Sequence, residues 1–338
     1  MRLLREARLR APELEPADWA TGEVYALAAL QGRVVVLDFF SYADPEGVEA
    51  LAAMHTLSDH YREAGVVVVG VHVPAYEFEK PIPAARQEMW RLGIPYPVAL
   101  DATYEVFRAY ESRNLPARFV IDADGYVRGW HHGPGGLQDI ESAVRALVRE
   151  KKKDRPLPPP LDPREWPAGV GLQWHATPEI RFGTRLAGFG PPDLEGELVD
   201  GQTRDFAEFP EMRAQGAAYL EGKWTVHPDR IVSENDEGGI EIVFEGTSVA
   251  AVLSPEDPDA EDLPQVEIAL DGAAPDAGAG ADLEDHGGRA VVPISRGRLF
   301  HLVSAAEFGI HNLSLRVKGR GASVHLLHFG TAPVPEEL

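Results

Sequence analysis

The sequence contains no cysteine. A chain without a thiol forms no disulfide bond and offers no thiolate as a nucleophile or as a metal ligand. It is also indifferent to the redox state of its compartment, so cysteine usage gives no indication of where the protein works.

Long hydrophobic runs are missing as well. No stretch approaches the roughly 20 apolar residues that a helix needs to cross a bilayer. The first ten residues, MRLLREARLR, alternate arginines with leucines and lack the continuous apolar segment of a secretory signal. We therefore expect a cytoplasmic protein that contacts no membrane.

Positive charge is scarce relative to negative charge. The chain has 32 Lys and Arg against 54 Asp and Glu, which gives a formal net charge of -22. A surface of this sign repels phosphate backbones, so we expect no nucleic-acid partner.

Motifs for common cofactors and hydrolytic centres are absent from the sequence. It has no glycine-rich phosphate loop, no G-x-S-x-G and no H-E-x-x-H pattern, so we expect no cofactor. His131 and His132 are adjacent on an expected strand, where neighbouring side chains point to opposite faces. The sequence therefore predicts no metal site.

What is present begins with a buried strand, a sharp turn and a helix, in the sequence VVVLDFFSYADPEG at 34–47. Asp44 followed by Pro45 is typical of a helix start, with Asp as the N-cap and Pro at the first helical position. A second apolar strand follows at 66–73. Strand, helix and strand at this spacing predict a parallel pair with a right-handed crossover.

These residues resemble the active-site segment of a thioredoxin, in which two cysteines occupy the positions of Asp44 and Gly47. The lead-in at 12–33 resembles the redoxin and TlpA-like branch of that superfamily. Three further segments, VHVPAYEFEK at 71–80, IPYPVALD at 94–101 and NLPARFVID at 114–122, are similar to DipZ-type and NHL-repeat-associated thioredoxin domains. The resemblance implies an α/β thioredoxin-like fold over residues 1–150 and a cis peptide bond before Pro116.

The end of this domain has its own local signals. The turn at 122–125 closes a hairpin on Gly125, and a final amphipathic helix is expected over 136–150. A charged run then passes into a proline-rich one, which predicts a semi-rigid linker over 151–176.

Residues 177–338 predict an all-β sandwich of the jelly-roll type, because short apolar runs alternate with Gly and Pro. The one candidate helix is 206–215. The segment TPEIRFG at 177–183 resembles the C-terminal region of DipZ-type proteins, which is similar to carbohydrate-binding modules. That resemblance makes four residues candidates for stacking on or bonding to a sugar: Tyr219, Trp224, Phe300 and His301. The competing interpretation is that they are core residues.

The functional hypothesis follows from the missing thiols. Asp44 keeps a negative charge at a helix N-terminus but forms no mixed disulfide, and Gly47 removes the resolving partner. We therefore expect a redox-inactive binding or scaffold protein, whose degenerate site is made by Asp44, Gly47, Tyr42 and Pro116. Three alternatives stay open: a thiol-disulfide oxidoreductase by descent, non-thiol chemistry at Asp44, and a glycan-binding protein. The identity of the protein, small-molecule or glycan partner and the oligomeric state do not follow from the sequence.

Overall fold

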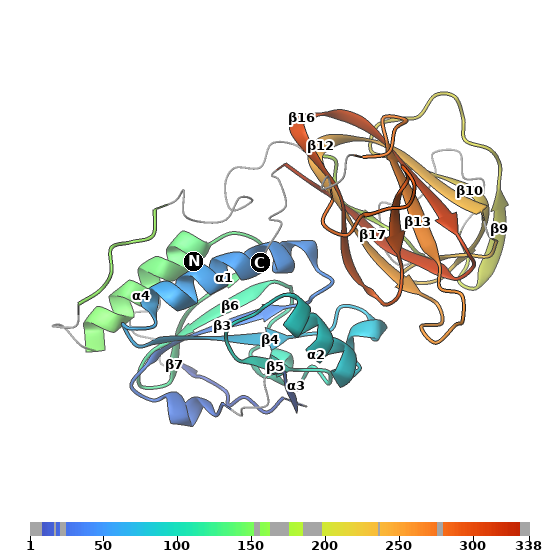
Figure 1. Cartoon of the computed structure of the whole chain (residues 1–338). Helices are drawn as coiled ribbons and strands as arrows, with labels where there is room; N and C mark the ends of the chain where they lie inside the picture. Colours follow the sequence, from blue (N-terminus) through green and yellow to red (C-terminus); the bar gives the residue numbers. More distant parts are fainter. Residues whose placement is uncertain are drawn as a thin grey trace. The chain divides into compact units, whose positions relative to one another are not determined.

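The computed structural model describes residues 9–16, 18–20, 25–151, 156–162, 176–184, 198–235, 237–275 and 280–331. The chain divides into two compact units, one within 1–171 and the other within 172–336 (Figure 1). No helix in the described ranges is long and apolar enough to span a membrane.

The described residues of the first unit contain a seven-stranded mixed sheet in the order β1-β7-β6-β3-β4-β5-β2. Helices α1 and α4 lie together on one face of this sheet, and α3 lies on the other (Figure 1). In chain order its elements are β1 (Leu9–Arg10), β2 (Asp18–Trp19), η1 (Leu27–Leu30), β3 (Val34–Phe40), α1 (Pro45–Tyr61), β4 (Val66–His72), η2 (Glu77–Glu79), α2 (Ile82–Arg91), β5 (Val98–Leu100), α3 (Glu105–Ala109), β6 (Ala117–Ile121), β7 (Tyr126–His132) and α4 (Leu137–Lys151).

The predicted parallel pair is confirmed. Strand β3 is buried along its whole length, as expected of a central strand covered on both faces, and it pairs in parallel with β4 from Val34 opposite Val66 to Phe40 opposite His72. The hairpin turn is also confirmed, because Gly125 closes it with a φ of 85°, a region that other residues rarely adopt.

The predicted semi-rigid linker is described in part. Its residues 156–162 pack against the first unit. Leu161 is buried, and its N–H donates to Glu141 Oε1 at 2.8 Å. Arg145 Nη1 donates to the Pro158 carbonyl at 2.8 Å. Residues 152–155 and 163–175 of the expected linker lie outside the described residues.

The described residues of the second unit form strands and no helix, and these strands pair with one another antiparallel. Within those residues, ten strands form one connected sheet. They are β8 (Ile180–Arg181), β9 (Gln202–Phe206), β10 (Ala218–Val226), β11 (Ile231–Ser233), β12 (Glu237–Pro255), β13 (Gln265–Leu270), β14 (Glu284–Asp285), β15 (Ala290–Pro293), β16 (Arg298–Lys318) and β17 (Ala322–Gly330).

Two long strands organise this unit. The pairing of β12 with β16 runs through a shift in register between Gly246 and Ser248, as at a β-bulge, without ending either strand. Before the bulge β12 also pairs with β10, and after it with β17. The expected helix at 206–215 is wrong: β9 ends at Phe206, and an irregular segment containing Pro210 follows.

Candidate functional site

The turn between β3 and α1 forms the centre of the candidate site. Asp44 has extended backbone angles, and its carboxylate accepts a hydrogen bond from the Gly47 N–H at 3.2 Å. Pro45 follows at the first helical position, where no backbone donor is needed. The predicted N-cap is therefore confirmed, and the carboxylate is held against the helix terminus.

Gly47 sits in a space that a side chain would crowd. A Cβ atom there would lie 3.1 Å from Asp44 Oδ2, 3.3 Å from the Ser41 carbonyl oxygen and 3.5 Å from Phe40 Cβ. Its neighbours would have to move by a few tenths of an ångström to admit even a methyl group. The absence of a side chain at Gly47 thus leaves room for the Asp44 carboxylate that accepts its N–H.

Pro116 lies at the same end of the sheet. The Leu115–Pro116 peptide bond is cis, as the resemblance implied. Ala117, the next residue, pairs with Phe39 near the end of β3, which brings the buried Pro116 beside the strand end that leads into the turn. The Pro116 carbonyl accepts from the Gly133 N–H at 2.8 Å, so the loop is anchored to the end of β7.

A buried carboxylate fixes the turn from beneath. Glu79 Oε2 accepts from the Ser41 hydroxyl at 2.7 Å and lies 3.1 Å from His72 Nε2, while its Oε1 accepts from the backbone N–H groups of Ala75 and Tyr76 at 2.8 and 3.0 Å. The side chains of Glu79 and His72 are 0% and 2% exposed. Because Glu79 stands between Ser41 and His72 and solvent is excluded, this buried cluster holds the turn in place.

Tyr42 belongs to the same buried layer. Its ring stacks on His72 with centroids 5.0 Å apart and an interplanar angle of 10°, and its hydroxyl donates to the Phe78 carbonyl at 3.3 Å. It is fully buried. Tyr42 therefore shapes the turn from inside instead of lining an open site.

A buried ion pair lies further along β3. Arg118 Nε donates to Asp38 Oδ1 at 2.9 Å across the paired strands, and both side chains are 0% exposed. Burial raises the pKa of Asp38, and the neighbouring guanidinium opposes that rise. Asp38 Oδ2, Arg118 Nη2 and the Tyr96 hydroxyl have no hydrogen-bond partner among the described residues.

The aromatic candidates in the second unit are buried, whereas stacking on a sugar requires an exposed ring face. Trp224, Phe300 and Tyr219 are only 0%, 1% and 6% exposed. Trp224 packs against Gly238, and its Nε1 donates to the Glu221 carbonyl at 2.9 Å. Phe300 lies under the Arg298 guanidinium at 3.8 Å, so neither ring offers a face to a sugar. The stacking prediction is corrected: these aromatic residues belong to the core.

His301 is half-buried beside that core. Its backbone N–H donates to Asp282 Oδ2 at 2.7 Å, and it pairs with Ala250 on β12. In the first unit, His131 lies 3.0 Å from the Pro134 carbonyl through Nε2, whereas His132 packs edge-on against Phe119. Within the described ranges, no group of three His, Asp or Glu side chains is placed to hold a metal ion.

Sequence reasoning missed the role of Glu79. The segment at 71–80 shows a family resemblance, but Ser41 and Glu79 are 38 residues apart, and the parallel pairing of β3 with β4 brings them together. No spacing rule along the chain could have joined them.

Comparison with known proteins assigns both units. Residues 8–129 match the AhpC/TSA family, and residues 177–330 match a family described as thioredoxin like C-terminal domain. The chain thus consists of a thioredoxin-like redoxin domain followed by that C-terminal domain.

Individual relatives and solved structures match parts of the chain. Protein DipZ of Mycobacterium tuberculosis is 30% identical over 231 residues, which cover 67% of this chain and 32% of DipZ. The thiol-disulfide oxidoreductase YkuV of Bacillus subtilis is 24% identical over 132 residues, 39% of this chain and 88% of YkuV. The crystal structure of a thiol:disulfide interchange protein from Chlorobium tepidum has a TM-score of 0.35 and 25% identity, and covers 42% of this chain and 97% of its own.

Proposed function

We propose that this chain, a thioredoxin-like redoxin joined to a thioredoxin-like C-terminal domain, binds an extended segment of another protein beside Asp44 and Pro116 without exchanging disulfides. The observation that carries the proposal is the bond from the Gly47 N–H to the Asp44 carboxylate. The related oxidoreductases require a thiolate at this helix N-terminus, and here the position holds the Asp44 carboxylate. The negative charge that the helix dipole stabilises is therefore present without a sulfur atom.

Buried contacts that hold the turn support a preformed binding surface. Glu79 holds the turn through Ser41, and the Gly133 N–H donates to the Pro116 carbonyl at 2.8 Å. A preformed surface loses little conformational entropy on binding. Because the chain has no cysteine, it forms no mixed disulfide with a partner, which leaves the oxidoreductase alternative without a reacting atom.

The segment before Pro116 offers suitable contacts for a peptide. Arg113 and Asn114 are exposed and supply side-chain donors, and Leu115 is half-buried and apolar. Donors beside a small apolar surface suit the carbonyl groups and alternate side chains of an extended chain. Non-thiol chemistry at Asp44 has less support, because its carboxylate already accepts a hydrogen bond from the helix terminus.

The test uses a thiol-blocked unfolded polypeptide as the probe. Reduced, carboxymethylated ribonuclease A is titrated into the ¹⁵N-labelled full chain, and amide shifts are followed. We expect saturable changes at residues 42–47 and 113–117. Leu115→Lys should weaken binding, whereas Trp90→Lys, at a side chain 84% exposed on α2, should not. Changes confined to other residues, or none at all, would overturn the proposal.

A further inference from the structure

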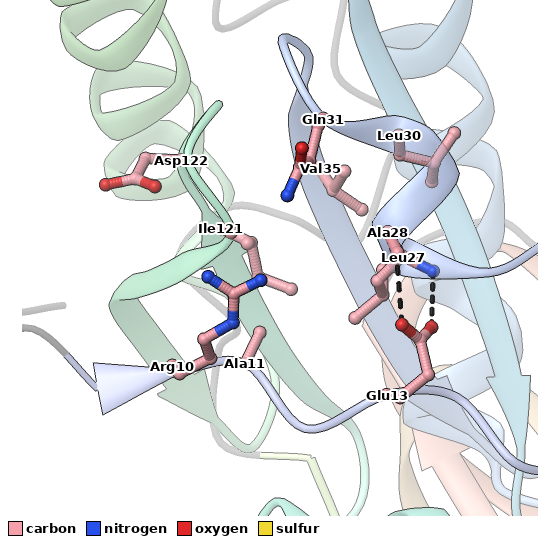
Figure 2. Close-up of a pocket in the computed structure, with 11 residues that line it drawn as sticks. Arg10, Ala11, Glu13, Leu27, Ala28, Leu30, Gln31, Val35, Ile121 and Asp122 are labelled. Carbon is pink, nitrogen blue, oxygen red and sulfur yellow. Dashed lines mark hydrogen bonds between the residues drawn. The ribbon is translucent and has the colours of Figure 1, made fainter.

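A cavity of about 270 Å³ opens at the other end of the first unit's sheet (Figure 2). Val35, near the start of β3, and Ile121, at the end of β6, both line it. The Asp44 turn follows the opposite end of β3, and a strand of this length at about 3.3 Å per residue separates the two places by roughly 20 Å. The cavity is therefore distinct from the candidate site.

Most of the lining is apolar. The walls come from η1, β3, β6 and the segment after β1, as the close-up in Figure 2 shows. The apolar lining residues are Ala11, Leu27, Ala28, Leu30, Val35 and Ile121. Such a surface favours an apolar ligand body, because burial removes it from water.

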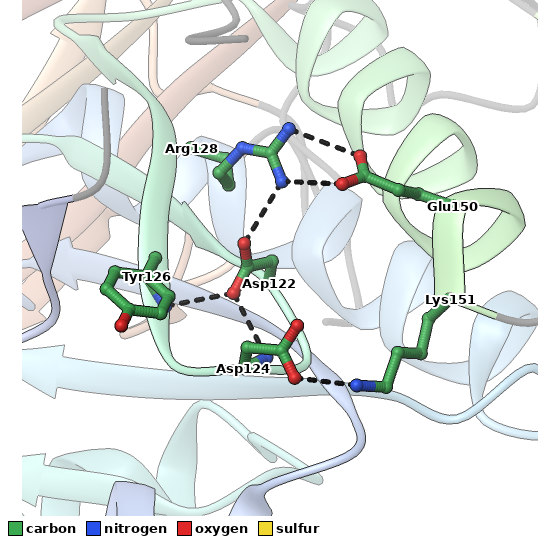
Figure 3. A network of polar contacts seen from close by, with 6 residues as sticks. All are labelled: Asp122, Asp124, Tyr126, Arg128, Glu150 and Lys151. Carbon is green, nitrogen blue, oxygen red and sulfur yellow. Dashed lines mark hydrogen bonds and ion pairs between the residues drawn. The ribbon is translucent and has the colours of Figure 1, made fainter. Parts of the chain in front are cut away.

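Both carboxylates at the cavity are already engaged. Glu13 accepts through one oxygen from the Leu27 N–H and through the other from the Ala28 N–H at 3.2 Å. Asp122 accepts from the backbone N–H groups of residues 124 and 126 at 3.0 Å each, and Arg128 Nη1 donates to it at 3.0 Å (Figure 3). Arg128 also donates two hydrogen bonds to Glu150 on α4, so it links the Asp122 carboxylate to that helix.

Arg10 and Gln31 supply the polar groups that remain. The Arg10 guanidinium lies 5.7 Å from the centre of the Tyr126 ring, and no ion pair joins it to any residue in the described ranges. The Gln31 side chain likewise makes no hydrogen bond to other residues within those ranges. An uncommitted guanidinium at an apolar cavity suits a planar carboxylate, which it binds through two parallel N–H groups.

We propose that this cavity binds a small organic carboxylate, with its apolar body against Leu30, Val35 and Ile121 and its carboxylate on Arg10. The volume sets the size of the ligand. Cavities of about 300–1,000 Å³ hold drug-sized molecules and one of about 150 Å³ holds benzene, so a six-carbon chain or a single ring bearing a carboxylate fits. Gln31 supplies a second donor to the carboxylate.

Sodium hexanoate is the probe, and hexan-1-ol is its uncharged match. Each is titrated into the ¹⁵N-labelled full chain. We expect saturable amide shifts at Val35, Ile121 and Gly125 with hexanoate. Arg10→Met should weaken hexanoate binding about tenfold, the loss of one charge-assisted contact, and leave hexanol binding unchanged. The matched control Arg33→Met removes an exposed arginine outside the cavity lining and should change neither.

A second variant tests the place of binding. Ala28 is exposed at the cavity, so Ala28→Trp should obstruct it while keeping the backbone bond to Glu13, and should abolish the shifts with both probes. Arg10 also lines a second cavity of about 350 Å³ near Trp130 and His132. Shifts centred on those two residues, no saturable shifts, or equal affinity in the Arg10 variant would each overturn the proposal.

Discussion

The Glu79 carboxylate accepts a hydrogen bond from the Ser41 hydroxyl at 2.7 Å, and both side chains are excluded from solvent. Glu79→Ala would leave that hydroxyl and the N–H groups of Ala75 and Tyr76 without their acceptor. We expect a loss of about 2 kcal/mol or more in the free energy of unfolding, measured by urea denaturation. The matched variant Glu77→Ala, at a side chain 83% exposed in the same segment, should change it by less than about 0.5 kcal/mol. Equal losses in the two variants would contradict a structural role for Glu79.

Two cysteines introduced at the turn should allow dithiol chemistry. In the double variant Asp44→Cys with Gly47→Cys, the first thiol lies at the N-terminus of α1, which lowers its pKa. We expect a disulfide under oxidised glutathione, detected by mass, and reduction of insulin in the presence of dithiothreitol. Each single variant has one thiol and serves as a control. A double variant that stays a dithiol would show that this turn no longer admits the bond.

The buried pair of Asp38 and Arg118 should behave as a unit. Arg118→Met leaves an uncompensated buried carboxylate and should cost about 3–5 kcal/mol of unfolding free energy. Adding Asp38→Leu removes that charge and should recover most of the loss. A double-mutant cycle by chemical denaturation measures the coupling. Additive losses would mean that the two charges stabilise the fold independently.

His325 should make stability depend on pH. Burial lowers its pKa to about 4, with Asp229 raising it and Arg230 lowering it by smaller amounts. In the unfolded chain the group titrates at its ordinary value of 6.5. As the pH falls below 6.5, His325 becomes protonated in the unfolded state but stays neutral in the folded state. The free energy of unfolding therefore decreases until the pH falls below the folded-state pKa of about 4.

The measurement compares unfolding free energies at two pH values. Between pH 7 and pH 5 the wild-type chain should lose roughly 2 kcal/mol through this group, and His325→Gln should lose correspondingly less. His286→Gln, at a side chain 47% exposed, should match the wild type. An identical pH dependence in all three proteins would rule out this linkage.

The sequence predicted those parts of the fold that depend on local signals. Asp44 followed by Pro45 indicates a helix start in any context, and Gly125 indicates a tight turn. The cis bond at Pro116 needed the resemblance as well, because proline alone favours trans. The length of β12 depends on its partner, because its pairing with β16 continues across the register shift at Gly246.

The rest depended on contacts between distant residues. Alternation along a strand predicts that Trp224 and Phe300 share a face with other apolar residues, but it does not predict whether that face is buried. In the structure both residues lie in the hydrophobic core of the second unit. The proline-rich segment was expected to be a spacer from its composition, and what holds it is the buried Glu141 on α4, 20 residues from Leu161. The contact between Glu79 and Ser41 likewise cannot be predicted until β3 and β4 are known to be paired.

The space at Gly47 limits which residues this position can accept. A Cβ atom there would lie 3.1 Å from the Asp44 carboxylate and 3.3 Å from the Ser41 carbonyl oxygen. Replacing Asp44 with a smaller residue removes the first contact but leaves the second, which comes from the backbone of the turn. Any larger residue at position 47 therefore requires the backbone between β3 and α1 to shift, so the shape of the turn and the identity of residue 47 can change only together.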